Sequence, residues 1–305
     1  MSHERVKADL RGVAFTNPVP FSEGGGDVLH GELSNNIEWI VDRGAKLIIP
    51  CGNTGEYYSL SMSERANVVE TVVSAAGDAT VLAGLGGSIK SALQLVSAYE
   101  EAGADALMVM HPIHTYQHHE GLRNYYERII EASDLPVVLY KRGPELTHDL
   151  IADLADYEDV VAVKYADNDI KAFSQAVEDV EGDIVWSNGI AERFAPAFAI
   201  EGAEGYTTGI GNFVPEQTLA LMEALREEDW TEAKRIRDAL RGYEDLREEP
   251  GENNTLAAAN NVPAVKFGME LAGLYGGPVR EPLVELSAED EERAREYYDR
   301  IVSTV

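Results

Sequence analysis

The first two-thirds of this 305-residue chain alternate short apolar segments with longer amphipathic ones. The apolar segments are rich in branched residues and lack a polar residue at every second position, which is typical of strands buried on both faces. The amphipathic segments repeat their apolar residues at helical spacing. The pattern predicts eight strands, at Gly12–Thr16, Lys46–Cys51, Thr80–Leu85, Ala106–Met110, Val137–Tyr140, Val160–Lys164, Ile184–Ser187 and Gly205–Thr208.

Helices are predicted between most of these strands. The helix that begins near Ser63 follows Ser61, whose hydroxyl is well placed to accept from the free backbone N–H groups of the first turn. The predicted helices are Ser63–Ala76, Ile89–Ala102, Glu120–Ala132, His148–Leu154, Ile170–Val177 and Ala191–Glu201.

Eight strand–helix units predict an α/β fold, a closed parallel (β/α)8 TIM barrel over residues 1–214. An open doubly wound sheet is the alternative. Such a sheet usually has a glycine-rich phosphate loop after its first strand, whereas here the first strand is followed by Asn17-Pro18-Val19-Pro20-Phe21. The nearby cluster Gly24-Gly25-Gly26-Asp27 is interpreted as a surface turn rather than as a phosphate cradle.

From Pro215 onward the pattern predicts helices only. A polar stretch, Glu248–Asn254, interrupts them and is predicted to be a loop. We therefore expect residues 215–305 to form a C-terminal helical extension of the barrel. Its predicted helices are Gln217–Leu225, Trp230–Leu246, Val262–Ala272 and Ala288–Ile301.

The chain is strongly acidic, with 54 Asp and Glu against 25 Lys and Arg and a net charge of -29. Only eight of the basic residues are lysine. Excess carboxylate with little lysine suits a protein that stays soluble at very high salt, where charge repulsion is screened. We interpret the composition as halophilic adaptation rather than as a surface for a cationic partner. The same charge would repel phosphates, which argues against nucleic-acid binding.

The cysteine content and the length of the apolar runs exclude further classes of protein. Cys51 is the only cysteine, which excludes an intrachain disulfide and a multi-cysteine metal site, and its apolar neighbours favour a buried structural thiol. The N-terminus lacks the apolar core of a signal peptide, and no apolar run approaches the length of a membrane span. We therefore expect a cytoplasmic protein with no membrane partner.

A lysine at the end of the sixth predicted strand is the most informative residue. Lys164 follows the apolar run Val160–Val163 and precedes an acidic segment. A buried or half-buried ammonium is unfavourable unless it is paired, and it responds with a lowered pKa. A lysine with such a pKa is an amine nucleophile toward carbonyls. The alternative is a structural ion pair between Lys164 and Asp167 or Asp169.

In a barrel of this kind the active site lies at the C-terminal ends of the strands. Lys164 would therefore share one mouth with the hydroxyl, amide and imidazole groups that end or follow the other strands. No group of His, Asp or Glu there has metal-ligand spacing, and no cofactor is expected. These strand-end groups are Gly52-Asn53-Thr54-Gly55-Glu56, His111-Pro112-Ile113-His114, Tyr140, Ser187-Asn188-Gly189 and Thr207-Thr208-Gly209.

This constellation suits imine chemistry on a 2-keto acid. The amine of Lys164 attacks the keto carbon, loss of water gives an iminium, and Tyr140 relays protons in the steps that follow. Hydroxyls and N–H groups of the turn at Asn53 and Thr54 can hold the substrate carboxylate. Structural alternatives stay open: Tyr140 as a cap of the barrel rim, Gly52 and Gly55 as parts of a tight turn, and His114, His118 and His119 as solvated loop residues.

Several motifs resemble the dihydrodipicolinate synthase / N-acetylneuraminate lyase family. They are the turn Gly52–Leu60 followed by Ser63-Glu64-Arg65, Tyr140, Val161–Lys164, Gly202–Pro215, and Lys266–Leu286 with Arg280-Glu281-Pro282-Leu283. The resemblance covers nearly the whole chain. It implies a homotetrameric barrel with C-terminal helices and cofactor-free class I Schiff-base lyase or aldolase chemistry. It also implies that Lys164 forms the Schiff base, Tyr140 is the acid/base and Thr54 binds the substrate carboxylate.

Four positions depart from the synthase branch of that family. The family turn reads Gly-Thr-Thr-Gly-Glu, and Asn53 replaces the first threonine, which belongs to the synthase's proton relay; an amide is a poor proton carrier. His114 stands where the synthase has a tyrosine borrowed from a neighbouring subunit. Arg142 resembles the Tyr-x-Arg of the family's keto-deoxy sugar-acid dehydratases, whereas Glu145 is nearest to the arginine that holds the synthase's second substrate.

The sequence thus predicts a Schiff-base-forming lyase that acts on a small 2-keto acid, preferably a dehydratase or aldolase of 2-keto-3-deoxy sugar acids. The alternatives are dihydrodipicolinate synthase, which condenses pyruvate with aspartate semialdehyde, and a family member that only binds a keto acid. The expected catalytic residues are Lys164 and Tyr140, and the expected substrate-binding residues are Asn53, Thr54, Gly52, Arg142, His114 and Thr207.

Overall fold

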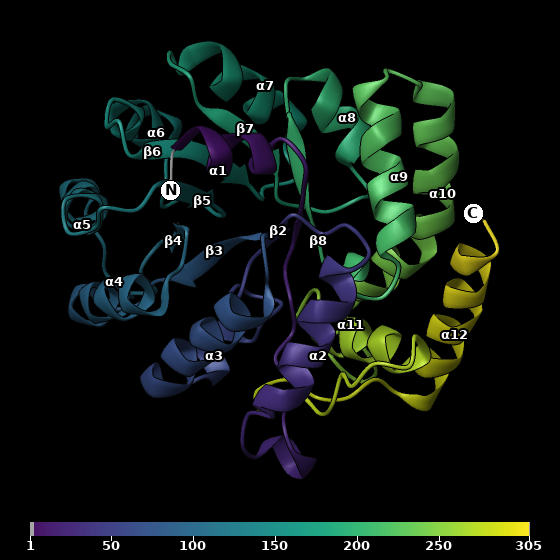
Figure 1. The fold of residues 1–305 in the computed structure, drawn as a ribbon. Coiled ribbons are helices and arrows are strands. Elements are labelled where there is room, and N and C mark those ends of the chain that lie inside the picture. Colours follow the sequence, from purple (N-terminus) through teal and green to yellow (C-terminus); the bar gives the residue numbers. More distant parts are fainter. Residues whose placement is uncertain (1–2, 305) are drawn as a thin grey trace.

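The computed structural model describes residues 3–304 as a closed barrel of eight parallel strands, ordered β1 to β8 around the ring. Helices surround the barrel, and those of the C-terminal third stand against one side of it (Figure 1). The predicted (β/α)8 TIM barrel with C-terminal helices is therefore confirmed. Residues 1–2 and 305, the outer ends of the two predicted units 1–214 and 215–305, lie outside the described residues.

All eight predicted strands are present, and every residue in them is buried. Helices cover the outer face of the barrel while side chains fill its interior, so both faces of each strand demand apolar residues. The strands are β1 (Val13–Phe15), β2 (Leu47–Ile48), β3 (Thr80–Leu85), β4 (Ala106–Met110), β5 (Val137–Lys141), β6 (Val160–Tyr165), β7 (Val185–Asn188) and β8 (Gly205–Thr208).

The ten helices predicted from apolar spacing are also present. One start differs: α8 begins at Ala195 rather than at Ala191, because Ala191 has a left-handed backbone (φ 62°) that no α-helix contains. The helices are α3 (Met62–Ala75), α4 (Ile89–Ala102), α5 (His119–Ile130), α6 (His148–Ala155), α7 (Ile170–Asp179), α8 (Ala195–Ile200), α9 (Pro215–Arg226), α10 (Trp230–Glu248), α11 (Asn261–Leu271) and α12 (Ala288–Val302).

The sequence pattern does not predict two further helices, α1 (His3–Leu10) and α2 (His30–Val41). In α1 only Val6 and Leu10 are buried, so its apolar stripe is too short to stand out among charged residues. It packs against β1, β6 and β7. In α2 a glycine and two asparagines lower the helix propensity, and packing against α3 overrides that preference.

The register of the sheet brings the predicted chemistry together. Tyr140 in β5 is paired with Lys164 in β6, and Lys164 is paired with Ser187 in β7. Paired residues of neighbouring strands lie side by side in a parallel sheet. Tyr140, Lys164 and Ser187 therefore stand at the same height, near the C-terminal end of the barrel.

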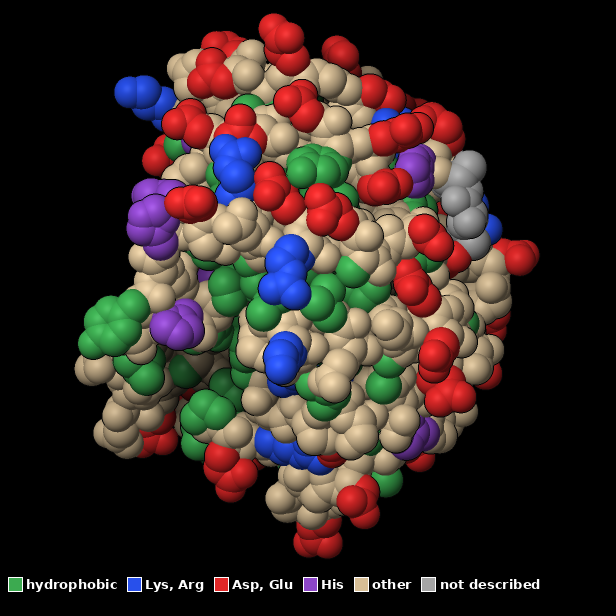
Figure 2. Space-filling view, turned by 90° about the vertical axis from the view of Figure 1, so that its left-hand side faces the viewer, with side chains coloured by type: hydrophobic (Ala, Val, Ile, Leu, Met, Phe, Trp, Pro, Cys, Tyr) green, Lys and Arg blue, Asp and Glu red, His purple; other side chains and the backbone are tan. Residues whose placement is uncertain are grey.

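Acidic side chains are spread over the face shown in Figure 2, and basic side chains are fewer there. Exposed acids also pair with arginines, as in the contact of Arg11 with Glu204 at 2.7 Å. Pairs of this exposed kind contribute little to stability. Across residues 3–304, no helix has the length and apolar character that crossing a bilayer would require.

A buried ion pair joins the C-terminal helices to the barrel. Nζ of Lys266 in α11 lies 2.6 Å from Oε1 of Glu56, in the turn after β2, and both residues are almost fully buried. Lys266 also donates to the carbonyl of Pro278 at 2.6 Å and lies over the ring of Phe21. Oε2 of Glu56 accepts from the backbone N–H of Arg280 at 3.0 Å. The C-terminal segment therefore fixes the turn after β2.

Breaking this pair should destabilise the fold strongly. Glu56→Gln leaves the Lys266 ammonium buried without a counter-charge, a change that typically costs about 3–5 kcal/mol. The loss is measured as the free energy of unfolding in urea at constant salt. Glu232→Gln removes an exposed helical pair with Arg235 and is the control, for which a far smaller loss is expected. Equal losses in the two variants would contradict the role given to the buried pair.

Candidate active site

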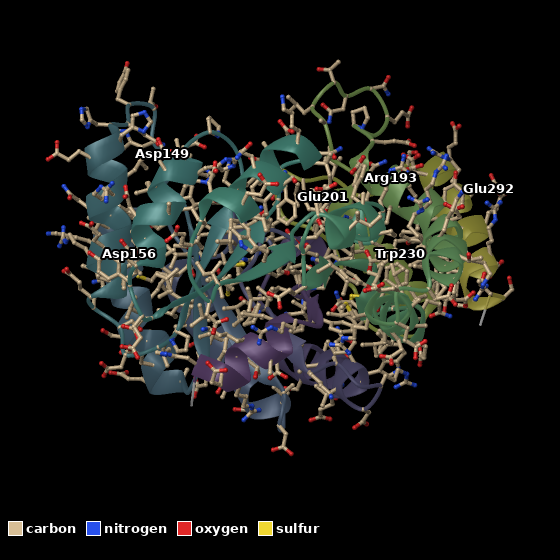
Figure 3. The ribbon with its side chains drawn as sticks, turned by 90° about the horizontal axis from the view of Figure 1, so that it is seen from above. Asp149, Asp156, Arg193, Glu201, Trp230 and Glu292 are labelled. Carbon is tan, nitrogen blue, oxygen red and sulfur yellow. The ribbon has the colours of Figure 1, made fainter. Side chains whose placement is uncertain are left out.

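A cavity of about 450 Å³ opens at the C-terminal ends of the strands. Its wall combines strand-end residues with residues of α10, α11 and the segment between these helices. In Figure 3 this segment is the yellow-green loop that rises at the top of the view. Arg193, labelled below it, pairs with Asp245 of α10 at 2.7 Å and so ties α10 to the loop after β7.

A second and larger cavity, of about 570 Å³, lies elsewhere. It is lined by α8, α9 and the first residues of β8, beside Trp230 (Figure 3). None of the predicted site residues lines it. Because it meets β8 at the N-terminal end of the strand, it lies at the end of the barrel where active sites of this fold are not found.

Lys164 is buried at the end of β6, only 6% exposed, and has no ion-pair partner among residues 3–304. The two acids considered as partners are engaged elsewhere. Asp167 pairs with Lys141 at 2.5 Å, and Asp169 caps the N-terminus of α7. Burial, followed by the nearby Arg142 cation, lowers the pKa of Lys164 to about 7. The alternative of a structural ion pair is therefore wrong, and neutral amine is available near pH 7.

Tyr140 stands beside this amine, with Nζ of Lys164 4.6 Å from the centre of its ring. The phenol oxygen accepts from Nδ2 of Asn53 at 3.1 Å and from Nη1 of Arg142 at 3.4 Å. Because both neighbours are donors, the hydrogen of the phenol is left for a third partner in the cavity. A proton-transfer group needs this freedom.

The turn after β2 contributes Asn53 and Thr54 to the wall of the same cavity. Cys51 and Glu56, at its two ends, both have a left-handed backbone, with φ of 58° and 52°, which is unfavourable for residues other than glycine. A Cβ on Gly84 of β3 would lie 2.3 Å from the carbonyl oxygen of Cys51, so only glycine allows this approach. The backbone N–H groups of Thr54 and Gly55 meet no acceptor within residues 3–304. Such an arrangement suits a carboxylate.

Six of the eight predicted site residues line one cavity. Gly52 lies behind the turn, where its Cα faces Ile49 and Met108. His114 is exposed in the loop after β4, where Nδ1 accepts from the N–H of Tyr116 at 3.0 Å, and it is not part of the cavity wall. The residues brought together are Asn53, Thr54, Tyr140, Arg142, Lys164 and Thr207.

The sequence pattern does not predict the contribution of α10 and α11 to this wall. Arg247 is buried there, and its Nη1 donates to Oε1 of Glu244 at 2.6 Å. Its Nη2 donates to Oδ1 of Asn261 at 3.1 Å. The only sequence signal is the spacing of three between Glu244 and Arg247, which is equally typical of a solvated helix face.

A (β/α)8 barrel that holds a buried amine beside a phenol at its strand ends defines the class of Schiff-base-forming, class I lyases. The sequence matches the Dihydrodipicolinate synthetase family over residues 9–300. The chain belongs to this family, so the resemblance of the motifs is confirmed.

Its relatives carry two different names. The 4-hydroxy-tetrahydrodipicolinate synthase of Methanothrix thermoacetophila is 30% identical over 293 residues, 94% of this chain and 95% of the relative. The probable 5-dehydro-4-deoxyglucarate dehydratase of Acidovorax ebreus is 27% identical over 307 residues, 99% of both chains. The crystal structure of dihydrodipicolinate synthase from Oceanobacillus iheyensis has a TM-score of 0.93 and 34% identity, covering 99% of this chain and 100% of that one. These names place the relatives in one family but differ in the reaction and the substrate that they state.

The lowered pKa of Lys164 sets a pH limit on Schiff-base formation. Only the neutral amine attacks a carbonyl, so the rate should be level above about pH 7 and fall by about tenfold per pH unit below it. The rate of borohydride-trapped adduct with pyruvate, followed from about pH 5.5 to 9, measures this. Arg142→Gln removes a cation that lowers the pKa of Lys164, so the fall should begin at higher pH. Identical profiles would contradict the contribution of Arg142.

Proposed function

We propose that this chain forms its Schiff base with a 2-keto-3-deoxy sugar acid, which it dehydrates or cleaves. The observation that carries the proposal is the pair of N–H donors on the Tyr140 oxygen, Asn53 at 3.1 Å and Arg142 at 3.4 Å. The relative from Acidovorax ebreus supports the same branch, because it is named a probable dehydratase of 5-dehydro-4-deoxyglucarate.

Lys164 supplies the nucleophile. Its amine adds to the C2 carbonyl of the keto acid, and loss of the carbonyl oxygen as water leaves an iminium on Nζ. The iminium withdraws electrons from C3, so a proton leaves C3 and an enamine forms. Departure of the C4 hydroxyl, protonated as it leaves, converts the enamine into a conjugated iminium. Water then hydrolyses this iminium and regenerates the amine.

Tyr140 is placed to move these protons. A base that takes the proton from C3 can return it to the departing C4 hydroxyl, so dehydration needs no net proton exchange with solvent. Asn53 and Arg142 hold the phenol oxygen through N–H groups, and neither passes a proton onward at neutral pH. Proton exchange between the substrate and a single side chain suits a dehydratase or an aldolase. The synthase pattern, in contrast, has a relay hydroxyl at position 53.

The carboxylate of the substrate fits the turn after β2. The unpaired backbone N–H groups of Thr54 and Gly55 are donors of the kind that carboxylates accept from. Arg142 lines the mouth of the cavity and has no acidic partner among the described residues. Its charge favours the entry of an anionic substrate into a protein that is otherwise acidic.

Dihydrodipicolinate synthase is the second candidate, because relatives 30% and 34% identical carry that name or its systematic form. That reaction needs a cation for the carboxylate of the second substrate. Glu145, the residue nearest to that position in sequence, is an acid that lies outside the cavity wall, 3.9 Å from His111. A coupled assay with pyruvate and aspartate semialdehyde separates the candidates. Faster turnover there than on 2-keto-3-deoxy acids would overturn the preferred branch.

Reductive trapping tests the Schiff base itself. Incubation with pyruvate and borohydride should add one reduced pyruvyl group to Lys164, located by mass spectrometry of peptides. Lys164→Ala should lose both the adduct and turnover, whereas Lys171→Ala, an exposed lysine of α7, should keep both. An unmodified Lys164 with pyruvate bound would refute the mechanism. Turnover that survives in Lys164→Ala would mean that another residue is the nucleophile.

Removal of the phenol tests the proton transfer. Tyr140→Phe should lower kcat by roughly two to four powers of ten, the usual contribution of a positioned acid/base. Tyr58→Phe removes another phenol of the same cavity wall and should lose far less. A loss in Tyr140→Phe of less than about threefold would reduce Tyr140 to a packing role.

We also propose that the acidic surface is an adaptation to high salt and that the protein works as a cytoplasmic homotetramer. The support for the first is the net charge of -29 and the spread of acids in Figure 2. The support for the second is the family resemblance. All assays are therefore run at molar potassium chloride, where the surface charge is screened.

A further inference from the structure

An arginine of α10 reaches into the wall of the cavity over the end of β8. Arg247 is 5% exposed, and a Cβ added to Gly209, the residue after β8, would lie 2.5 Å from its Nη2. The guanidinium is fixed from two sides, by Glu244 at 2.6 Å and by Asn261 at 3.1 Å. The position of its Nε–H donor is therefore determined by α10 and α11 rather than by the substrate.

This Nε–H donor has no partner among the described residues. Nε of Arg247 is buried and meets no hydrogen-bond acceptor within residues 3–304. A buried N–H group without an acceptor is unfavourable, and native structures usually satisfy such groups with protein, water or ligand. Because Arg247 lines the same cavity as Lys164, a ligand bonded to Lys164 is the natural source of an acceptor.

The charges around Arg247 favour a neutral group on the ligand over a charged one. Glu244 already balances the guanidinium, and the carboxylate of Glu248 lines the same stretch of wall. Burial, followed by the nearby Glu244, raises the pKa of Glu192, which is fully buried and therefore favours its neutral form. A carboxylate of the ligand would meet the Nε–H donor, which has no partner among the described residues, but also the two carboxylates of Glu244 and Glu248. A hydroxyl accepts from the N–H and donates to a carboxylate, so it fits both.

The size of the cavity agrees with a ligand that spans both groups. A volume of about 450 Å³ lies within the usual range for sites that enclose drug-sized molecules, and a three-carbon keto acid would leave much of it empty. Thr207, Thr208 and Gly209 line the wall where β8 approaches Arg247. A sugar acid held at Lys164 by its second carbon extends its hydroxylated end along such a wall.

We propose that Arg247, Glu244 and Asn261 form a hydroxyl-binding subsite for the tail of the 2-keto acid, with Arg247 as a specificity-determining residue. The inference rests on the proposed function, since it assumes that the keto carbon is bonded to Lys164. It adds that the preferred substrate ends in hydroxyls rather than in a second carboxylate.

Trapping with two probes separates the subsite from the Schiff base. The concentration of pyruvate or of 2-keto-3-deoxygluconate that gives half-maximal borohydride adduct on Lys164 is measured at high salt. Replacing both Glu244 and Arg247 by Gln removes the pair without leaving a lone buried charge. This variant should need at least about tenfold more 2-keto-3-deoxygluconate, because lost hydrogen bonds to a substrate hydroxyl weaken its binding. For pyruvate the value should stay within about twofold.

Two further variants serve as controls. Arg241→Gln changes an exposed arginine of the same helix, paired with Asp245, and should leave both values unchanged. Arg247→Lys keeps a cation but not the fixed N–H group, so it should recover only part of the lost affinity for the sugar acid. An equal rise for both probes, or no rise for either, would overturn the subsite while leaving the Schiff base intact.

If the variants do not fold, the unmodified protein still provides an independent test of the subsite. Adduct formation with 2-keto-3-deoxygluconate should be half-maximal at lower concentration than with 5-dehydro-4-deoxyglucarate, which ends in a second carboxylate. The reverse order would contradict the proposed preference for a substrate whose tail ends in neutral hydroxyls. If neither pyruvate nor a sugar acid labels Lys164, the proposed function fails, and the subsite fails with it.

Discussion

The turn after β2 depends on one buried ion pair, between Glu56 and Lys266. Glu56 ends the turn in a left-handed conformation that its residue type disfavours. The ammonium of Lys266 at 2.6 Å compensates its buried charge and holds it in place. Asn53 and Thr54 belong to the same turn, so their distances to Tyr140 and to a substrate depend on it. The strand-end chemistry of the barrel is thus positioned by a helix that comes far later in the chain.

Three lysines within residues 3–304 are buried, and only Lys164 has no ion-pair partner there. Lys141 and Lys164 are each 6% exposed and Lys266 is 2% exposed. Lys141 has Asp167 and Lys266 has Glu56, whereas Lys164 has only the cation of Arg142 as a charge that acts on its pKa. Burial lowers the pKa of both Lys164 and Lys266, and the carboxylate of Glu56 counteracts part of that effect for Lys266. The proposed nucleophile is thus the buried lysine that the fold leaves without a carboxylate.

The sequence pattern was enough to predict an element or a contact wherever these depend only on the strands themselves. Strands β3 and β4 have the predicted bounds because burial on both faces demands nearly continuous apolar runs. Lys164 and Tyr140 could be expected to meet because strand ends of a barrel converge. Arg247 could not be found this way, since nothing in a charged helix says which face will cover the barrel. His114 lies outside the cavity wall because the loop after β4 turns outward, and α1 was too short to show a stripe.

The cavity wall has two origins, and this division has an evolutionary consequence. The strand ends contribute Lys164 and Tyr140, while α10 and α11 contribute Arg247 and Asn261. Under the proposed roles, residues on these helices can change and alter the substrate preference while Lys164 and Tyr140 are kept. Relatives that align with nearly the whole chain carry names as different as synthase and dehydratase, which agrees with such a division.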